Sequence, residues 1–114
     1  MWIFLNDAFL SIVANRDRPD DLLVRARVQG DIEKVFNGVV VIASPMADYP
    51  FRAVVDRRIV AGAILARVAG IDYDNFKGSV ADDGRHNAYL DVWAMMRARF
   101  NGGYSYECED DFDS

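Results

Sequence analysis

The sequence contains little of the chemistry on which many small proteins depend. It has one cysteine, one histidine, two lysines and three prolines in 114 residues. A lone cysteine, Cys108, cannot form an internal disulfide, so a reducing compartment is expected, with the cytoplasm as the default. The lone histidine, His86, would have to anchor any histidine-bearing metal site or Ser/His/Asp arrangement, and no neighbouring residue completes one. Neither a metal nor a cofactor is predicted.

Long apolar runs are also missing. No run approaches the roughly 20 residues that span a bilayer, and the N-terminal segment lacks the basic start and cleavage site of a signal peptide, so no membrane partner is expected. The remaining composition, 52% hydrophobic and 27% charged with a net charge of -5, is typical of a folded acidic protein. We expect a single domain over residues 1–103, followed by an acidic tail over residues 104–114.

The most regular apolar pattern lies in residues 86–100. Its members recur at the spacing of one helix face and are Tyr89, Val92, Trp93, Met96 and Phe100. Asp82 and Asp83 precede the pattern as helix-capping carboxylates, and residues 101–103 follow it as a stop. The pattern predicts a core helix that lies on a sheet, with Trp93 at the centre of the core.

The first half of the chain supplies that sheet. Strands are predicted at residues 2–5, 9–13, 22–27, 39–43 and 51–55, because these segments alternate or are rich in β-branched and aromatic residues. Residues 39–43 are continuously apolar, which is typical of a central strand covered on both faces. A short helix capped by Asp31 and a longer helix capped by Asp56 are also predicted. The order indicates an α+β fold, a single-layer and mostly antiparallel sheet of about five strands with two to three helices packed on one face.

Arginines form one candidate site. Arg25 and Arg27 share one face of a predicted strand, and Arg52 comes from another strand, with Arg57 and Arg58 at the next helix start. Arg25, Arg27 and Arg52 are therefore candidates for binding the anion of a phosphate-containing or nucleotide substrate, with Tyr73 or His86 as a proton carrier. Negative net charge and the lack of interleaved aromatics on that strand face favour pairing with carboxylates instead, so direct nucleic-acid binding is not expected.

Carboxylates form the other candidate site. As a group they would bind a protein with a basic surface, and no catalytic residue is predicted among them. Asp72 and Asp74 have the spacing of magnesium ligands but lack the remaining ligands of a metal loop. The candidate partner-binding residues are Asp20, Asp21, Asp72, Asp74, Asp82, Asp83, Glu107, Glu109, Asp110 and Asp111.

Several segments resemble a family of short bacterial and phage-borne proteins that has no assigned activity. These segments are LNDAFLSIV, LLVRARVQGDIEKVF, YPFRAVVDRRIVA, IDYDNFKGSVAD and RHNAYLDVW, and they cover Trp2 to about Met96. In size and charge the chain is similar to phage-encoded inhibitors of nucleic-acid-handling defence complexes, of which the anti-CRISPR proteins are the best known. The resemblance implies a non-enzymatic inhibitor that occupies a basic, nucleic-acid-binding surface. A small enzyme acting on a phosphate-containing substrate and a structural or interaction protein are the alternatives.

Overall fold

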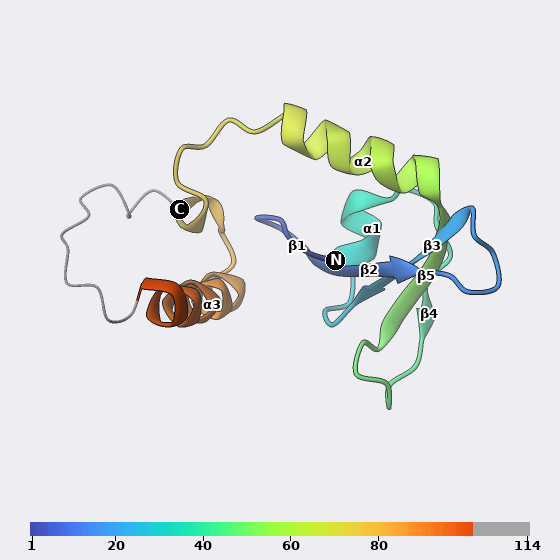
Figure 1. Cartoon of the computed structure of the whole chain (residues 1–114), viewed down its shortest axis with the longest axis horizontal. Coiled ribbons are helices and arrows are strands. Elements are labelled where there is room, and N and C mark those ends of the chain that lie inside the picture. Colours follow the sequence, from blue (N-terminus) through green and yellow to red (C-terminus); the bar gives the residue numbers. More distant parts are fainter. Residues whose placement is uncertain (102–114) are drawn as a thin grey trace. The chain divides into compact units, whose positions relative to one another are not determined.

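The computed structural model describes residues 1–101, which divide into two compact units (Figure 1). Unit 1 comprises residues 1–71, and the described part of unit 2 comprises residues 72–101. The acidic tail predicted over residues 104–114 lies outside the described residues, and the single domain predicted over residues 1–103 stays a prediction. Each unit is described by itself.

Unit 1 contains a five-stranded sheet in which every neighbouring pair is antiparallel. The strand order is β1-β2-β3-β5-β4. The α+β class is confirmed. The elements are β1 (Trp2–Phe4), β2 (Phe9–Ala14), β3 (Asp21–Ala26), α1 (Asp31–Val35), β4 (Ile42–Ala43), β5 (Phe51–Asp56) and α2 (Arg57–Ala69).

Strand alternation places the core of unit 1 between the sheet and both of its helices (Figure 1). Alternate strand residues point to that face because successive side chains of a strand face opposite ways. They meet Ile32 of α1, Phe36 directly after it, and Val60 of α2. The buried strand residues are Leu10, Ile12, Val24, Ala26, Ala53 and Val55. Asp56 caps α2 as predicted, since its side chain accepts a hydrogen bond from the Arg58 amide at 2.7 Å.

The strand predicted at residues 39–43 is wrong in extent and in place. Only Ile42 and Ala43 form β4, which lies at the edge of the sheet beside β5. The Ile42 side chain is 61% exposed. A continuous apolar run cannot be distinguished from an irregular segment by composition alone, and Val39 and Val41 instead pack against the core from outside the sheet.

Asp31 does not cap α1 as predicted. The cap residue is Gly30, whose φ of 94° lies in the left-handed region that glycine adopts without strain. Asp31 is instead fully buried, and its Oδ2 accepts a hydrogen bond from the Phe9 amide at 3.0 Å. A buried carboxylate needs such partners, because an unsatisfied polar group in the interior costs free energy. Asp31 therefore ties the start of β2 to α1.

Unit 2 consists of the 3-10 helix η1 (Lys77–Ser79) and helix α3 (Asp83–Asn101). The cap of α3 is as predicted, because Asp82 Oδ2 accepts from the Arg85 amide at 2.9 Å. Within the described part of unit 2, most of the predicted core face has no cover. Tyr89 is buried, but Trp93 is only half-buried, and Met96 and Phe100 are 53% and 72% exposed.

The physical reason is that helical spacing shows which residues share a face but not what covers that face. Within unit 2, the residues before α3 contact its first turns, where Phe76 stacks on Tyr89 with ring centroids 5.7 Å apart. The later turns have no such cover among the described residues of unit 2. No helix in residues 1–101 is both long enough and apolar enough to cross a membrane.

Candidate anion-binding site

The face of the sheet opposite α1 and α2 has a cationic centre. Strand residues that point away from the core occupy this face, which we call the open face because neither helix of unit 1 packs on it. The strand register aligns one row of five residues across the open face, each the Cα partner of the next: Trp2, Ser11, Arg25, Arg52 and Ile42. The row passes from an indole through a hydroxyl to two guanidinium groups.

Arg25 is held in place by two neighbours. Its guanidinium Nη2 donates to Ser11 Oγ at 2.8 Å, and its Cζ lies 4.6 Å from the centroid of the Tyr49 ring. Ser11 and Tyr49 are both buried, so the contacts that orient Arg25 are themselves fixed by packing. Arg25 Nε is buried and has no hydrogen-bond partner among residues 1–101. The Arg25 side chain is therefore fixed in orientation, but its Nε lacks a hydrogen-bond acceptor among these residues.

Arg27 also lies over the Tyr49 ring, but it already forms an ion pair with Asp48. Its Cζ lies 4.1 Å from the ring centroid, and its Nη1 donates to Asp48 Oδ1 at 2.6 Å and to the Asp48 carbonyl oxygen at 3.0 Å. The hydrogen bond to Asp48 raises the pKa of the Arg27 guanidinium above its ordinary value. Since Asp48 neutralises its charge, Arg27 contributes less to anion binding than its position suggests.

Arg52 lies directly across from Arg25 on the neighbouring strand. Opposed residues of an antiparallel pair have Cβ atoms about 4.5 to 5.5 Å apart, and like charges at that separation destabilise the sheet. Arg52 Nε is also buried without a hydrogen-bond partner in the described part of the chain, and neither arginine forms an ion pair there. An anion bound by both guanidinium groups would offset the repulsion.

The two arginines at the start of α2 do not join this cluster. Arg57 Nη2 donates to the Pro19 carbonyl oxygen at 3.0 Å, and Arg58 is 94% exposed beside Asp56 at 3.7 Å. Both belong to a helix that covers the other face of the sheet. The cluster therefore comprises Arg25, Arg27 and Arg52, the three arginines that the sequence singled out for anion binding.

The pattern of a single strand does not reveal the aromatic side chains beside the cluster, because they come from β1 and β2. Phe4 and Phe9 are Cα partners with ring centroids 4.7 Å apart, and Trp2 meets Phe9 edge-on at 6.2 Å. All three lie on the open face by strand alternation. A register for the predicted hairpin around Asn6 and Asp7 would have placed Trp2 beside Ser11, and so close to Arg25.

Charge is divided unevenly between the two units. Residues 1–71 contain nine Lys and Arg against eight Asp and Glu, whereas residues 72–114 contain four against ten. The negative net charge that argued against an anion site therefore arises from the second part of the chain. Unit 1 itself is almost neutral, and its open face has unpaired cations.

The candidate carboxylates are not gathered into one site within either unit. Asp21 pairs with Arg18 at 2.8 Å in unit 1, where Asp20 is exposed, and Asp82 caps α3 in unit 2. The exposed ones in unit 2 include Asp72, Asp74 and Asp83. Glu107, Glu109, Asp110 and Asp111, like Cys108, lie outside the described residues.

The predicted proton carriers belong to unit 2. His86 Nδ1 donates to the Lys77 carbonyl oxygen at 2.8 Å, a contact that joins α3 to η1. The Tyr73 ring packs against Phe76 with centroids 5.9 Å apart. Within residues 1–101, no group of three or more His, Cys, Asp or Glu side chains is arranged to hold a metal ion.

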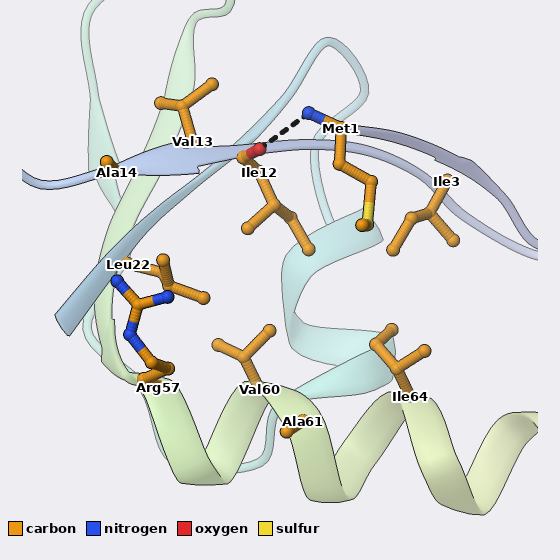
Figure 2. Close-up of a pocket in the computed structure, with 10 residues that line it drawn as sticks. All are labelled: Met1, Ile3, Ile12, Val13, Ala14, Leu22, Arg57, Val60, Ala61 and Ile64. Atoms are coloured by element: carbon orange, nitrogen blue, oxygen red, sulfur yellow. Dashed lines mark hydrogen bonds between the residues drawn. The ribbon is translucent and has the colours of Figure 1, made fainter. Parts of the chain in front are cut away.

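A cavity of about 450 Å³ lies on the helix side of the sheet in unit 1 (Figure 2). Ile12 and Ile3 extend toward it from the strands, and Val60 and Ile64 face them from α2. Its lining is apolar except for Arg57, which is held by the Pro19 carbonyl. Ligand sites combine apolar walls with several convergent polar groups, and this cavity lacks them. The open face is therefore the stronger candidate.

Comparison with known proteins adds no assignment. No family model, curated protein or solved structure matches this chain. The resemblance to short bacterial and phage-borne proteins therefore stays a prediction.

Proposed function

We propose that the protein binds a phosphate-bearing ligand on the open face of unit 1, through Arg25 and Arg52. The observation that carries this proposal is the cross-strand pair of guanidinium groups, neither of which forms an ion pair within residues 1–101. Like charges placed opposite each other destabilise a sheet, so an anion bound by both guanidinium groups would be favoured.

Phosphate suits the pair better than a single carboxylate does. A phosphate monoester carries about -1.5 to -2 charges at pH 7 and three acceptor oxygens, which match two cations and their free N–H groups. Guanidinium groups bind phosphate through paired hydrogen bonds in a fixed plane. Tyr49 beneath Arg25 and Ser11 beside it reduce the side-chain freedom that binding would otherwise remove.

Binding is favoured over catalysis by the groups around the pair. Arg25, Arg52, Ser11 and Tyr49 include no histidine and no carboxylate, the side chains that most often act as general acids and bases. The enzyme hypothesis placed this role on Tyr73 or His86, and His86 Nδ1 is engaged with the Lys77 carbonyl within unit 2. We therefore describe the site as a binding site.

The test is titration of pyrophosphate into the full chain, measured by calorimetry at two salt concentrations. Arg52→Gln should weaken binding about tenfold or more, because hydrogen bonds from a charged group contribute about 1.5 to 3 kcal/mol each. Arg58→Gln is the matched control, since it removes the same charge from a 94% exposed side chain on α2. Equal affinity of the two variants would refute the site.

A second proposal concerns the acidic part of the chain, namely that exposed carboxylates of unit 2 occupy a basic surface of a nucleic-acid-binding protein as an inhibitor. It is supported by the ten acidic against four basic residues in positions 72–114. A pull-down from the native host should recover such a partner at low salt and lose it at high salt. A partner retained equally at both salt concentrations would contradict this proposal.

A further inference from the structure

We infer that the phosphate-bearing ligand of the open face is single-stranded nucleic acid, with Trp2 as the stacking platform for a base. The inference rests on the proposed anion site and deepens it. It requires that a base-binding surface lie within reach of the two arginines, and the strand register provides one.

Trp2 lies in the same cross-strand row as the arginines. It is the Cα partner of Ser11, which is the Cα partner of Arg25. Neighbouring strands are about 4.8 Å apart, so the backbone of Trp2 is roughly 10 Å from that of Arg25. An indole and a guanidinium both project from the same face at this separation. A strand lying across the row could therefore place a phosphate on the arginines while a base reaches the indole.

The Trp2 side chain is available for stacking. It is 66% exposed, although tryptophan is usually well buried in a folded protein. Its contact with Phe9 is edge-on, with an interplanar angle of 74°, and Phe9 in turn packs on Phe4. The two phenylalanines thus support the indole from one side. Proteins that bind single strands combine such aromatic platforms with cationic residues on an uncovered sheet face.

A single strand fits these features better than a duplex. Stacking on an indole requires an unpaired base whose flat face is accessible, whereas the bases of a duplex are stacked on each other. The open face is the surface of a sheet and presents no helix of unit 1 that could enter a major groove. Two guanidinium groups without an ion pair among residues 1–101 would contact few phosphates, which suits a short stretch of single strand.

The experiment compares two probes that share phosphates but differ in bases, a labelled oligothymidylate and inorganic polyphosphate. Both are titrated against the full chain by fluorescence anisotropy, direct or by competition, at several salt concentrations. Trp2→Leu should weaken oligothymidylate binding about tenfold, the lower part of the range for loss of base stacking, and leave polyphosphate binding unchanged. Trp93→Leu is the matched control, because Trp93 is the other tryptophan and belongs to unit 2.

Arg52→Gln, compared with Trp2→Leu, separates this inference from the proposed function. It should weaken both probes and reduce the slope of log K against log salt by about 0.7 for oligothymidylate, as loss of one phosphate contact predicts. Retained polyphosphate binding also shows that Trp2→Leu is folded. If Trp2→Leu binds oligothymidylate like the parent, or a duplex binds as tightly as the single strand, the inference is overturned and the anion site stands. If the parent binds neither probe, both are overturned.

Discussion

Units 1 and 2 differ in how far apart in sequence their contacting residues lie. In unit 1, Leu10, Val24 and Ile32 are completely buried and come from three different elements. In the described part of unit 2, only Val80 and Tyr89 are buried, and α3 contacts residues that directly precede it. Long-range packing therefore stabilises unit 1, whereas local helix contacts dominate within residues 72–101. A site that needs residues held at fixed separations is better placed in unit 1.

The comparison is tested most strongly by truncating one aromatic residue in each unit. Phe36→Ala should lower the free energy of unfolding by about 3 to 5 kcal/mol, the range for a buried aromatic, because Phe36 is only 2% exposed. Trp93→Ala should cost much less. The contacts of Trp93 include two cation–π contacts, with the Lys77 ammonium and the Arg97 guanidinium, each worth about 0.5 to 1 kcal/mol at an exposed site.

Urea denaturation followed by circular dichroism measures both variants. Equal losses would mean that the two residues belong to one cooperative core, and the distinction between the units would fail. If Trp93→Ala lowers the free energy of unfolding more than Phe36→Ala does, α3 would be the core helix that the sequence predicted.

Polar contacts provide the next test. Asp31→Ala should cost about 1 to 3 kcal/mol, because the Phe9 amide loses its buried acceptor. Asp82→Ala removes a helix cap and should cost about 1 kcal/mol. Hydrogen exchange distinguishes the two effects: protection should fall in β2 and α1 for the first variant, and only within residues 83–101 for the second. Loss of protection in β2 on substituting Asp82 would contradict the local character of unit 2.

The sequence predicted elements well wherever a local pattern determines the structure. Alternation in β3 and β5 identified the buried faces, and Asp56 and Asp82 were recognised as caps because a cap depends on neighbouring residues. Arg25 and Arg27 were assigned to one face by the same alternation. Their association with Arg52 was a hypothesis, because it depends on β3 pairing with β5, which is not visible in either segment alone.

The errors arose where partners distant in sequence decide the outcome. The apolar pattern of residues 39–43 predicted a central strand, but a strand is central only if two other strands pair with it. Asp31 precedes a helix and so resembled a cap, while its acceptor role depends on the Phe9 amide, 22 residues away. The exposed face of α3 has good helical spacing but little within unit 2 to cover it. Tertiary context overrides local propensity in each case.

The smallest expected effect concerns a polar contact that spans unit 1. Arg67 of α2 binds the Asp7 carboxylate through two hydrogen bonds, of 2.8 and 3.2 Å, which join residues 60 positions apart. The hydrogen bond from Arg67 lowers the pKa of Asp7 below its ordinary value of 3.8, although partial burial opposes the shift. Because the folded state binds the proton less tightly than the unfolded state, this contact stabilises the fold at pH values above 3.8. The stabilisation is lost as pH falls through the lowered pKa.

Asp7→Asn should therefore reduce the free energy of unfolding at pH 7 by no more than about 1 kcal/mol, because the pair is partly exposed to solvent. The difference between parent and variant should shrink toward zero as pH falls through the lowered pKa of Asp7, because the parent carboxyl then also becomes protonated. Thermal denaturation across that range measures it, and Asp17→Asn, in an exposed loop, controls for loss of one negative charge. A difference that persists unchanged at low pH would show that Asp7 acts through packing, and the link between the β1–β2 turn and α2 would then not be electrostatic.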